Sequence, residues 1–301
     1  MRGYEPLETI GSAQGFHSVF VDAVRAHHWV YERYQMLHRN IELNSIMWYE
    51  QDGRVVGVLC DWDLAENKGT GGHRSNHRAC DDAAVVWAVE RKENSVAKST
   101  TTELRATAED QATEQARNLE SAAPSNMATD SQCVVKPRYR TGTGPFMAMD
   151  LLRVSDPPIH KYRHDLESFF YAYIYFAATY NPDKQAFGYI EDWQRGSLVH
   201  IGHRKWDFLF EPQVRRRVAK AAHDTLKPLL AESTPLMNLL YQFGDIETDR
   251  AIITNLVNNP RMTPECKRAK IESLEKEREE KMSFSIFMEL LGVPEEESVC
   301  T

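Results

Sequence analysis

The segment that most constrains the fold is Ser168 to Pro182, which contains no charged residue and is rich in Phe and Tyr. Apolar residues recur at positions 166, 169, 170, 173, 174 and 177, which is the spacing of one helix beginning beside Asp165. The uncharged run of about 15 residues is shorter than the roughly 20 that a membrane-spanning helix needs. A helix this apolar must be covered on most sides, so we expect it at the centre of a mainly helical core.

The composition restricts the class of partner. The 301-residue chain has 36 Lys and Arg against 44 Asp and Glu, a formal net charge of −8, and no block of basic residues. We therefore expect neither nucleic acid nor a membrane as partner, because both need concentrated positive charge. The five cysteines are scattered without a C-x-x-C pair, which argues against a disulfide framework and a zinc site. The N-terminus lacks the apolar core of a secretory signal, and an intracellular protein, cytoplasmic or nuclear, is expected.

Local patterns predict a helix and a hairpin in the first part of the chain. Apolar residues at helical spacing over 16–36 indicate a helix with one buried face. The apolar segments 48–49 and 55–59 flank Asp52-Gly53, which is a strong signal for a β-hairpin. Residues 1–15 are expected to form a flexible terminus.

The middle and the end of the chain differ sharply in composition. From 67 to 135 the sequence is mostly polar and poor in large apolar residues, so it cannot bury enough surface to fold, and we expect a disordered insertion. After the central apolar helix, further helices are expected over 214–230, 236–243, 245–257 and 266–291, separated by Pro or Gly.

Three segments in fixed order resemble the lower lobe of a protein kinase. His38-Arg39-Asn40 stands where kinases have H-R-D, and Asp61-Trp62-Asp63 stands where they have D-F-G. Residues 142–150, GTGPFMAMD, resemble the G-T…M-A-P-E end of an activation segment. More narrowly, the strings DWDLA, RTGTGPFMAMDLL and HKYRHDLESFFY are similar to the fungal-type protein kinase family.

This resemblance implies a mainly α, protein kinase-like C-terminal lobe with a small β-hairpin at the catalytic loop. Its two parts would span 16–66 and 136–257, separated by the long disordered insertion at 67–135 in the activation segment and followed by a helical tail at 258–301. The N-lobe is expected to be absent, because only 37 residues precede His38 and they contain no glycine-rich loop and no strand lysine.

The resemblance also assigns the candidate catalytic and cofactor residues. It implies ATP and Mg²⁺, with Asp61 as the cofactor-binding and metal-binding carboxylate. His38 and Arg39 belong to the catalytic loop, but Asn40 stands at the position of the catalytic Asp and lacks the basic oxygen of a general base. The metal-binding Asn of the motif falls on Ser45, with Asn44 one residue earlier, so either is a candidate metal ligand.

Three further residues are expected to hold the fold. By resemblance, Asp165 hydrogen-bonds the catalytic loop around Arg39, and Asp150 pairs with a buried Arg of the later helices. Thr143 could be phosphorylated, contact the catalytic loop or form a turn, and the turn is the expected role. The segment 272–281 is expected to be a solvated charged helix and not a binding surface.

Three functions are consistent with these residues. The first is an inactive or truncated member of this Ser/Thr kinase-like family, and the second is a working kinase whose N-lobe is encoded upstream. The third is a pseudokinase that acts as an interaction module. A protein substrate or binding partner is expected in each case, and the sequence predicts no oligomeric state.

Overall fold

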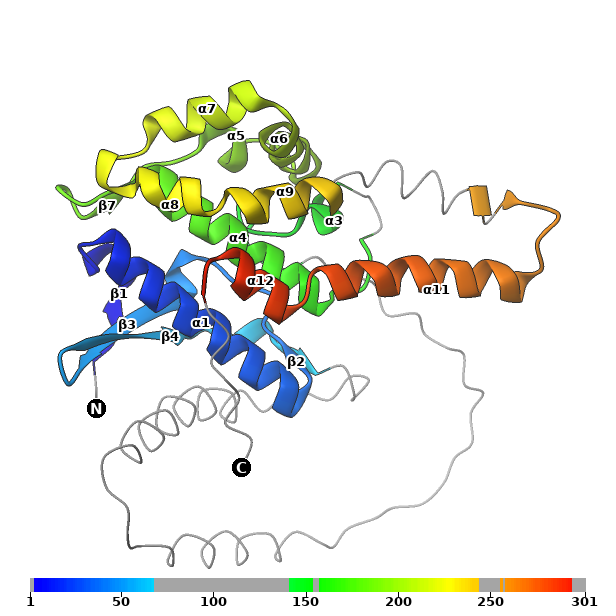
Figure 1. The fold of residues 1–301 in the computed structure, drawn as a ribbon, viewed down its shortest axis with the longest axis horizontal. Helices are drawn as coiled ribbons and strands as arrows, with labels where there is room; N and C mark the ends of the chain where they lie inside the picture. The colour runs from blue at the N-terminus through cyan, green and yellow to red at the C-terminus, as the bar shows by residue number, and fades with distance from the viewer. Residues whose placement is uncertain (1–2, 68–140, 154–156, 244–254, 257, 294–301) are drawn as a thin grey trace, which may run out of the picture. The chain divides into compact units, whose positions relative to one another are not determined.

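The computed structural model describes residues 3–67, 141–153, 157–243, 255–256 and 258–293, all of which belong to one unit. The described chain is mostly helical with small antiparallel sheets (Figure 1). Most of the expected insertion at 67–135 and of the expected helix at 245–257 lies outside these residues. No described helix is both long and apolar enough to cross a membrane.

Helix α4 (Tyr162–Thr179) forms the centre of the core, as the sequence predicted. Every residue of α4 from Tyr162 to Ala178 is buried. In Figure 1, α1 and α12 lie on one side of it and α8 and α9 on the other. Phe176 stacks on Phe16 of α1 with ring centroids 3.6 Å apart. Each fully buried Phe contributes about 1.5–3 kcal/mol, so the uncharged run stabilises the whole unit.

Helix α1 (Ala13–Tyr34) packs on strand β4 (Arg54–Leu59) at an unusually close distance. Ser12 caps the helix by accepting a hydrogen bond from the Gly15 amide at 3.0 Å. On the buried face, Asp22 accepts from the Gly57 amide at 3.1 Å. A Cβ atom at Gly57 would lie 2.1 Å from the Val19 carbonyl oxygen. Only glycine permits this contact between helix and strand.

The hairpin forms where the sequence predicted it and carries an additional strand. β3 (Ile46–Gln51) pairs antiparallel with β4 around Asp52-Gly53, and both turn residues have positive φ, at 53° and 75°, as a type I′ turn requires. β1 (Glu5–Pro6) adds to the free edge of β3, giving the order β1-β3-β4. A separate pair joins β2 (Met36–Leu37) to β5 (Glu66–Asn67).

The prediction of a flexible terminus at 1–15 is wrong for most of its length. Besides β1, the 3₁₀ helix η1 (Leu7–Thr9) places Leu7 in the core, where it is 1% exposed. The side chain of Trp48 donates a hydrogen bond to the Pro6 carbonyl at 3.1 Å. These contacts join residues about 40 positions apart, so no local periodicity could reveal them.

Short helices cover the other side of α4. They are α3 (Met149–Leu152), α5 (Glu191–Gln194), α6 (Leu198–Phe210), α7 (Pro212–Ala221), α8 (Lys227–Glu232) and α9 (Thr234–Phe243). A small ribbon of β6 (Tyr180–Asn181) and β7 (Ala186–Phe187) lies between α4 and α5 in the chain. The expected single helix at 214–230 is interrupted, because His223 leaves helical geometry and caps the 3₁₀ helix η4 (Asp224–Leu226).

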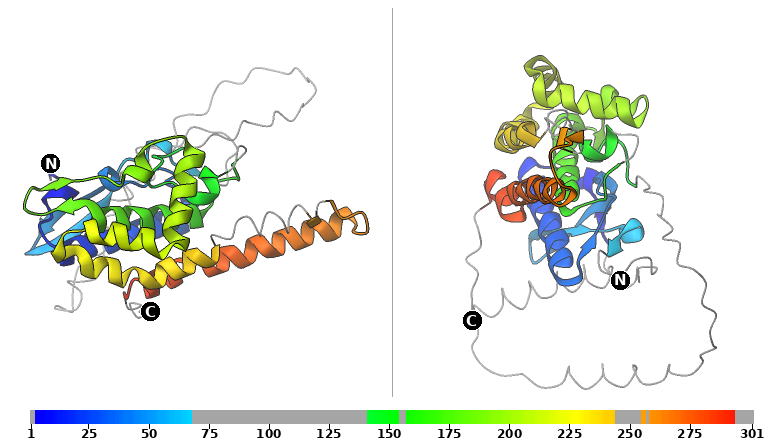
Figure 2. Two further views of the ribbon diagram at one scale, coloured as in Figure 1. Left: turned by 90° about the horizontal axis from the view of Figure 1, so that it is seen from above. Right: turned by 90° about the vertical axis from the view of Figure 1, so that its right-hand side faces the viewer.

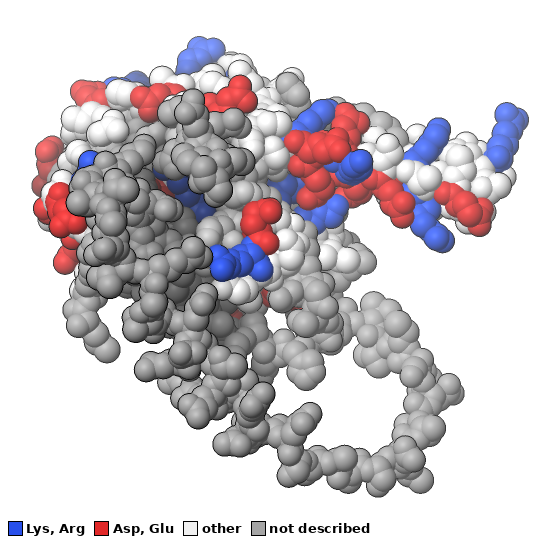
Figure 3. Space-filling model, turned by 60° about the horizontal axis from the view of Figure 1, so that its bottom comes forward, with Lys and Arg blue, Asp and Glu red and all other residues white. Residues whose placement is uncertain are grey.

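The expected tail helix is divided, and its second part belongs to the core. α11 (Pro264–Lys281) projects from the helical unit in the left view of Figure 2, with acidic and basic side chains side by side along it in Figure 3. Ser283 then caps α12 (Phe284–Leu290). Phe287 of α12 is fully buried, and Phe284 stacks on His28 of α1 at 3.8 Å. Helix α12 is therefore part of the packed unit.

Candidate functional site

The hairpin brings the two expected halves of the site together. The loop at 38–42 follows β2, and Asp61 follows β4, whose partner β3 begins directly after the loop. The Cys60 amide donates to the Ser45 carbonyl at 2.8 Å, which extends the ladder beyond the strands. Asn40 Nδ2 consequently lies 3.4 Å from Asp61 Oδ2 and donates to it. Residues 21 positions apart thus face each other.

His38 is a framework residue of this loop. Its side chain is fully buried, with Nε2 donating to the Cys60 carbonyl at 2.8 Å and the ring 4.6 Å from that of Trp62. Burial lowers the pKa of His38 to about 4, although Asp165 and the Cys60 carbonyl oppose the shift. His38 is therefore neutral near pH 7 and joins the loop to the Asp61 segment.

Asp165, at the start of α4, holds the loop through the backbone. Its Oδ2 accepts from the His38 amide at 2.9 Å and from His27 Nε2 at 2.8 Å. Its Oδ1 accepts from the Arg39 amide at 3.1 Å and from His160 Nε2 at 2.8 Å. Burial alone would raise the pKa of Asp165, but His160 and His27 outweigh it and hold that pKa well below its usual range. The carboxylate is permanently charged and fully bonded.

Two site residues have left-handed backbone geometry. Arg39 has φ 68° and Asp61 has φ 63°, a conformation that costs free energy in residues other than glycine. The Asp165 carboxylate stabilises it at Arg39, whose guanidinium binds Glu66 on β5. Strain of this kind at a loop that faces a carboxylate is typical of a functional site.

The two candidate metal ligands at 44 and 45 do not join Asp61. Ser45 is fully buried, and its hydroxyl accepts from the Glu42 amide at 3.0 Å and donates to the Glu42 carbonyl at 2.8 Å. This capping interaction starts the 3₁₀ helix η2 (Leu43–Ser45). Asn44 is exposed and forms no hydrogen bond to a described residue. That Ser45 ligates metal therefore stays a prediction, and in this structure its hydroxyl is used to build the loop.

The end of the activation segment packs directly on the catalytic loop. A Cβ atom at Gly142, which has φ 110°, would lie 2.9 Å from the Arg39 carbonyl oxygen. Thr143 Oγ1 donates to Glu42 Oε2 at 2.5 Å, and its carbonyl accepts from the Phe146 and Met147 amides. Thr143 thus forms the expected turn and also contacts the residue that caps η2.

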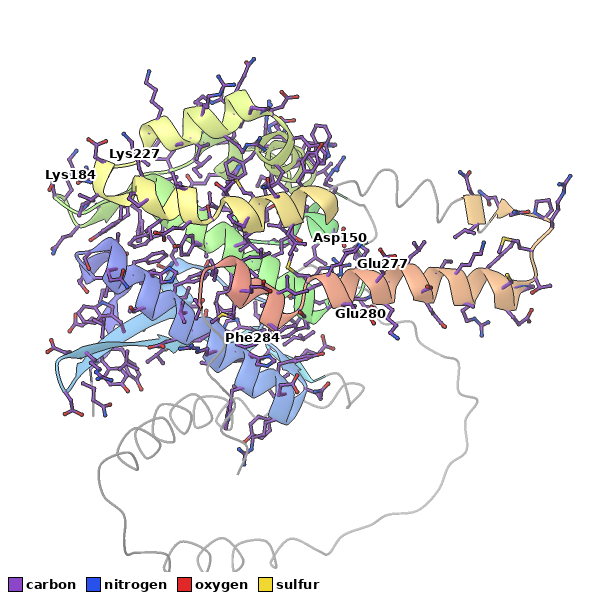
Figure 4. The ribbon with its side chains drawn as sticks, viewed as in Figure 1. Asp150, Lys184, Lys227, Glu277, Glu280 and Phe284 are labelled. Carbon is purple, nitrogen blue, oxygen red and sulfur yellow. The ribbon has the colours of Figure 1, made fainter. Side chains whose placement is uncertain are left out.

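Asp150 anchors the short helix α3. It pairs with an Arg of the central helix as well as with the expected Arg of a later helix. It lies beside the C-terminal part of α11 in Figure 4 and binds Arg163 of α4 at 2.6 Å and Arg278 of α11 at 3.2 Å. Burial would raise the pKa of Asp150, but the Arg163 guanidinium, aided by His164 and Arg278, holds it well below the usual range. Arg163, inside the central helix, is the partner that the sequence argument missed.

The expectation that 272–281 is only a solvated helix is wrong at one face. Glu279 accepts from Arg163 Nε at 3.0 Å, and Glu275 binds Lys161. The exposed Glu277 and Glu280 pair instead with Lys281 and Lys276 of the same helix. The half-buried face of α11 is itself charged, so the sequence shows no apolar periodicity for it.

Two more buried residues that the sequence argument missed complete the anchor. Lys205 of α6 donates to the Met147 carbonyl at 2.6 Å, and its ammonium lies 3.6 Å from the Tyr171 ring centroid. Glu167 of α4 accepts from the Met149 amide at 2.9 Å. Lys205 and Glu167 therefore hold the turn at 146–150 (FMAMD) through its backbone. The sequence argument also missed His27. Its position continues the buried face of α1, and this spacing could have identified it as a buried residue.

The described residues fit the expected Mg²⁺ poorly. Phosphoryl transfer needs two metal ions held by an Asp and a loop Asn. Here Asp61 supplies one exposed carboxylate, to which Asn40 donates. The Ser45 hydroxyl is hydrogen-bonded to the backbone of Glu42. No group of three His, Cys, Asp or Glu residues in the described ranges could hold a metal ion. At position 40 the side chain is an amide, which has no basic oxygen.

Comparison with known proteins gives one match. A family model described as fungal protein kinase matches residues 4–91 and 104–177, more than half of the chain. Its two segments include the catalytic loop, the Asp61 segment and most of α4. No curated protein and no solved structure matches the chain.

Proposed function

The chain belongs to the fungal protein kinase family, and from this premise we propose that it is a kinase-like protein whose own catalytic loop supports little or no phosphoryl transfer. The observation that carries the proposal is the pair of Asn40 and Asp61, in which an amide donates to the carboxylate at 3.4 Å. In a working loop the residue at position 40 accepts the proton of the substrate hydroxyl. Asn40 has no oxygen basic enough to do so.

The rest of the loop argues in the same direction. A positioned general base contributes about 10²–10⁴-fold to a rate, and its loss alone would reduce transfer strongly. The buried hydroxyl of Ser45 is bonded to Glu42 and is not free to bind a metal ion. Weak binding of Mg²⁺ and ATP follows, because a single carboxylate holds Mg²⁺ weakly, and the metal ion is what neutralises the phosphate charge.

The proposal is tested by radiolabelled phosphate transfer from Mg-ATP to a mixed Ser/Thr peptide library. The purified chain should transfer no more phosphate than Asp61→Ala, which removes the one carboxylate of the site. Asp63→Ala is the matched control, because Asp63 is an exposed carboxylate two residues away. Robust transfer by the wild type that Asp61→Ala abolishes and Asp63→Ala preserves would overturn the proposal.

Nucleotide binding is tested separately by thermal unfolding. A site with a Kd near 1 mM adds only about 0.4 kcal/mol of stability at about 1 mM ligand. We expect Mg-ATP to raise the unfolding midpoint by no more than the shift that about 0.4 kcal/mol produces. Asp61→Ala should leave this small shift unchanged. A large shift that depends on Asp61 would contradict the weak-binding part of the proposal.

A further inference from the structure

Helices α7, α8 and α9 enclose an open groove on the side of the unit away from the catalytic loop residues. We name it the α7–α9 groove, after its walls: Val218 and Ala219 of α7, Leu230 of α8 and Met237 of α9. Its volume is about 540 Å³, and Phe208 of α6 also lines it. None of the residues that line it belongs to the loop at 38–45 or to the Asp61 segment.

The sequence explains why the groove stays open. α7 rests on α4 and α6 through one apolar face, yet none of its residues is fully buried. Ala219 on one wall and Ala231 on another present only methyl groups, which fill little of the space between the helices. Leu230 and Met237 remain half-buried as a result, so apolar surface is available to a ligand.

Four cations surround this apolar surface. Arg215, Arg216 and Lys220 come from α7 and Lys227 from α8, whereas no Asp or Glu lines the groove. Arg216 and Lys220 form no ion pair with any residue that the structure describes. Arg215 donates to the Leu209 carbonyl, and Lys227, labelled in Figure 4 at the start of α8, binds the exposed Asp224. In a chain of net charge −8, this concentration of positive charge marks a place for an anionic partner.

The distribution of the cations selects the kind of partner. A fatty acid carries its charge at one end and would need cations at one end only. The α7 cations instead extend over the six residues from 215 to 220, or about 7.5 Å of helix rise, and Lys227 adds a cation from another wall. The ten residues of α7 give a groove wall of about 15 Å, the length of nearly three helical turns.

We propose that the α7–α9 groove binds a short acidic amphipathic helix of a partner protein. Apolar side chains at i, i+3, i+4 and i+7 of that helix enter between Val218, Leu230 and Met237, as in other helix-in-groove complexes. Its carboxylates pair with Arg216 and Lys220 at the rim. The proposal is independent of phosphoryl transfer, since the groove shares no residue with the loop.

The probe is a fluorescein-labelled peptide of about 14 residues, roughly four helical turns, with Leu and Phe at i, i+3, i+4 and i+7 and Glu elsewhere. Binding to the full chain is measured by fluorescence anisotropy. We expect the affinity to fall as salt rises from about 50 to 300 mM, because exposed charges are screened. Arg216→Glu/Lys220→Glu should weaken binding by about tenfold or more through reversed charge, and Ala231→Trp should weaken it by filling the groove.

The matched control is Arg268→Glu/Lys270→Glu, which makes the same change of charge on exposed positions of α11 and should alter the affinity less than about twofold. Thermal midpoints check that all variants fold. Equal weakening by the control pair, or equal binding of a peptide with the same Glu residues and Ala at every apolar position, would overturn the proposal. Binding of laurate at the groove without binding of the peptide would overturn it too.

Discussion

Asp165→Asn tests whether one buried carboxylate holds the catalytic loop in shape. The side chain is fully buried and accepts four hydrogen bonds, two on each oxygen. Each oxygen receives one backbone amide, from His38 or Arg39, and one imidazole, from His27 or His160. Asn has nearly the same size but one oxygen and one NH₂ group. Two of the four donors must therefore face another donor.

The size of the stability loss depends on how the two mismatched donors, one imidazole and one backbone N–H, can adjust to the new NH₂ group. The imidazole can change its tautomer and accept from the new amide, but a backbone N–H cannot. At least one hydrogen bond to a charged acceptor is lost, worth about 1.5–3 kcal/mol. If the imidazole does not adjust, two are lost and the cost rises to about 3–6 kcal/mol. Against a typical total stability of 5–15 kcal/mol, the loss is large.

Urea unfolding at neutral pH measures this loss, and amide hydrogen exchange locates it. We expect Asp165→Asn to lower the free energy of unfolding by at least about 1.5 kcal/mol and to speed exchange at the His38 and Arg39 amides in particular. Asp63→Asn, an exposed change of the same chemistry, should do neither. A loss below about 0.5 kcal/mol, or unchanged exchange at these two amides, would refute the reasoning.

Three other outcomes are expected, each measured as the free energy of unfolding in urea. Gly57→Ala should cost about 3 kcal/mol, because its Cβ would meet the Val19 carbonyl at 2.1 Å; a cost below 1 would contradict the close packing. Asp150→Ala should cost about 3–5 kcal/mol by leaving Arg163 buried without its main partner, and a neutral result would mean that the guanidinium escapes to solvent. Burial lowers the pKa of His38 from 6.5 to about 4 and that of His164 to about 3. The unfolded chain therefore binds the extra protons, and each of the two residues should lower stability by up to about 1.4 kcal/mol per unit as pH drops from 6 to 5. Replacing His38 by Gln should remove about half of this slope, and an unchanged slope would mean that His38 is not buried neutral.

Features encoded by local periodicity could be predicted from the sequence. The central helix and the Asp52-Gly53 hairpin lie where apolar spacing and turn chemistry placed them, because each is specified by residues within one segment. The hairpin then fixes the site, since the pairing of β3 with β4 brings Asp61 to Asn40. The order of the two motifs along the chain, with the hairpin between them, was therefore sufficient to predict that Asn40 and Asp61 lie in one site.

Features that depend on pairing between distant segments could not be predicted. β1 has only two residues and is stabilised by β3, about 40 residues away, so it has no pattern of its own. The half-buried face of α11 contacts the unit through Arg278 and Glu279, and its sequence therefore resembles that of a solvated helix. Ser45 matched a motif position, but whether its hydroxyl faced a metal or its own backbone depended on the local 3₁₀ turn.

The contacts that shape the catalytic loop do not use the side chain of residue 40. Asp165 binds the backbone amides of His38 and Arg39, and Gly142 packs on the Arg39 carbonyl. Exchange of the catalytic carboxylate for an amide at this position therefore leaves the forces that hold the loop intact. Asn40 even donates to Asp61, where two carboxylates without a metal ion would repel each other. The shape of the loop therefore does not depend on a carboxylate at position 40, which is why shape and activity must be tested by different variants.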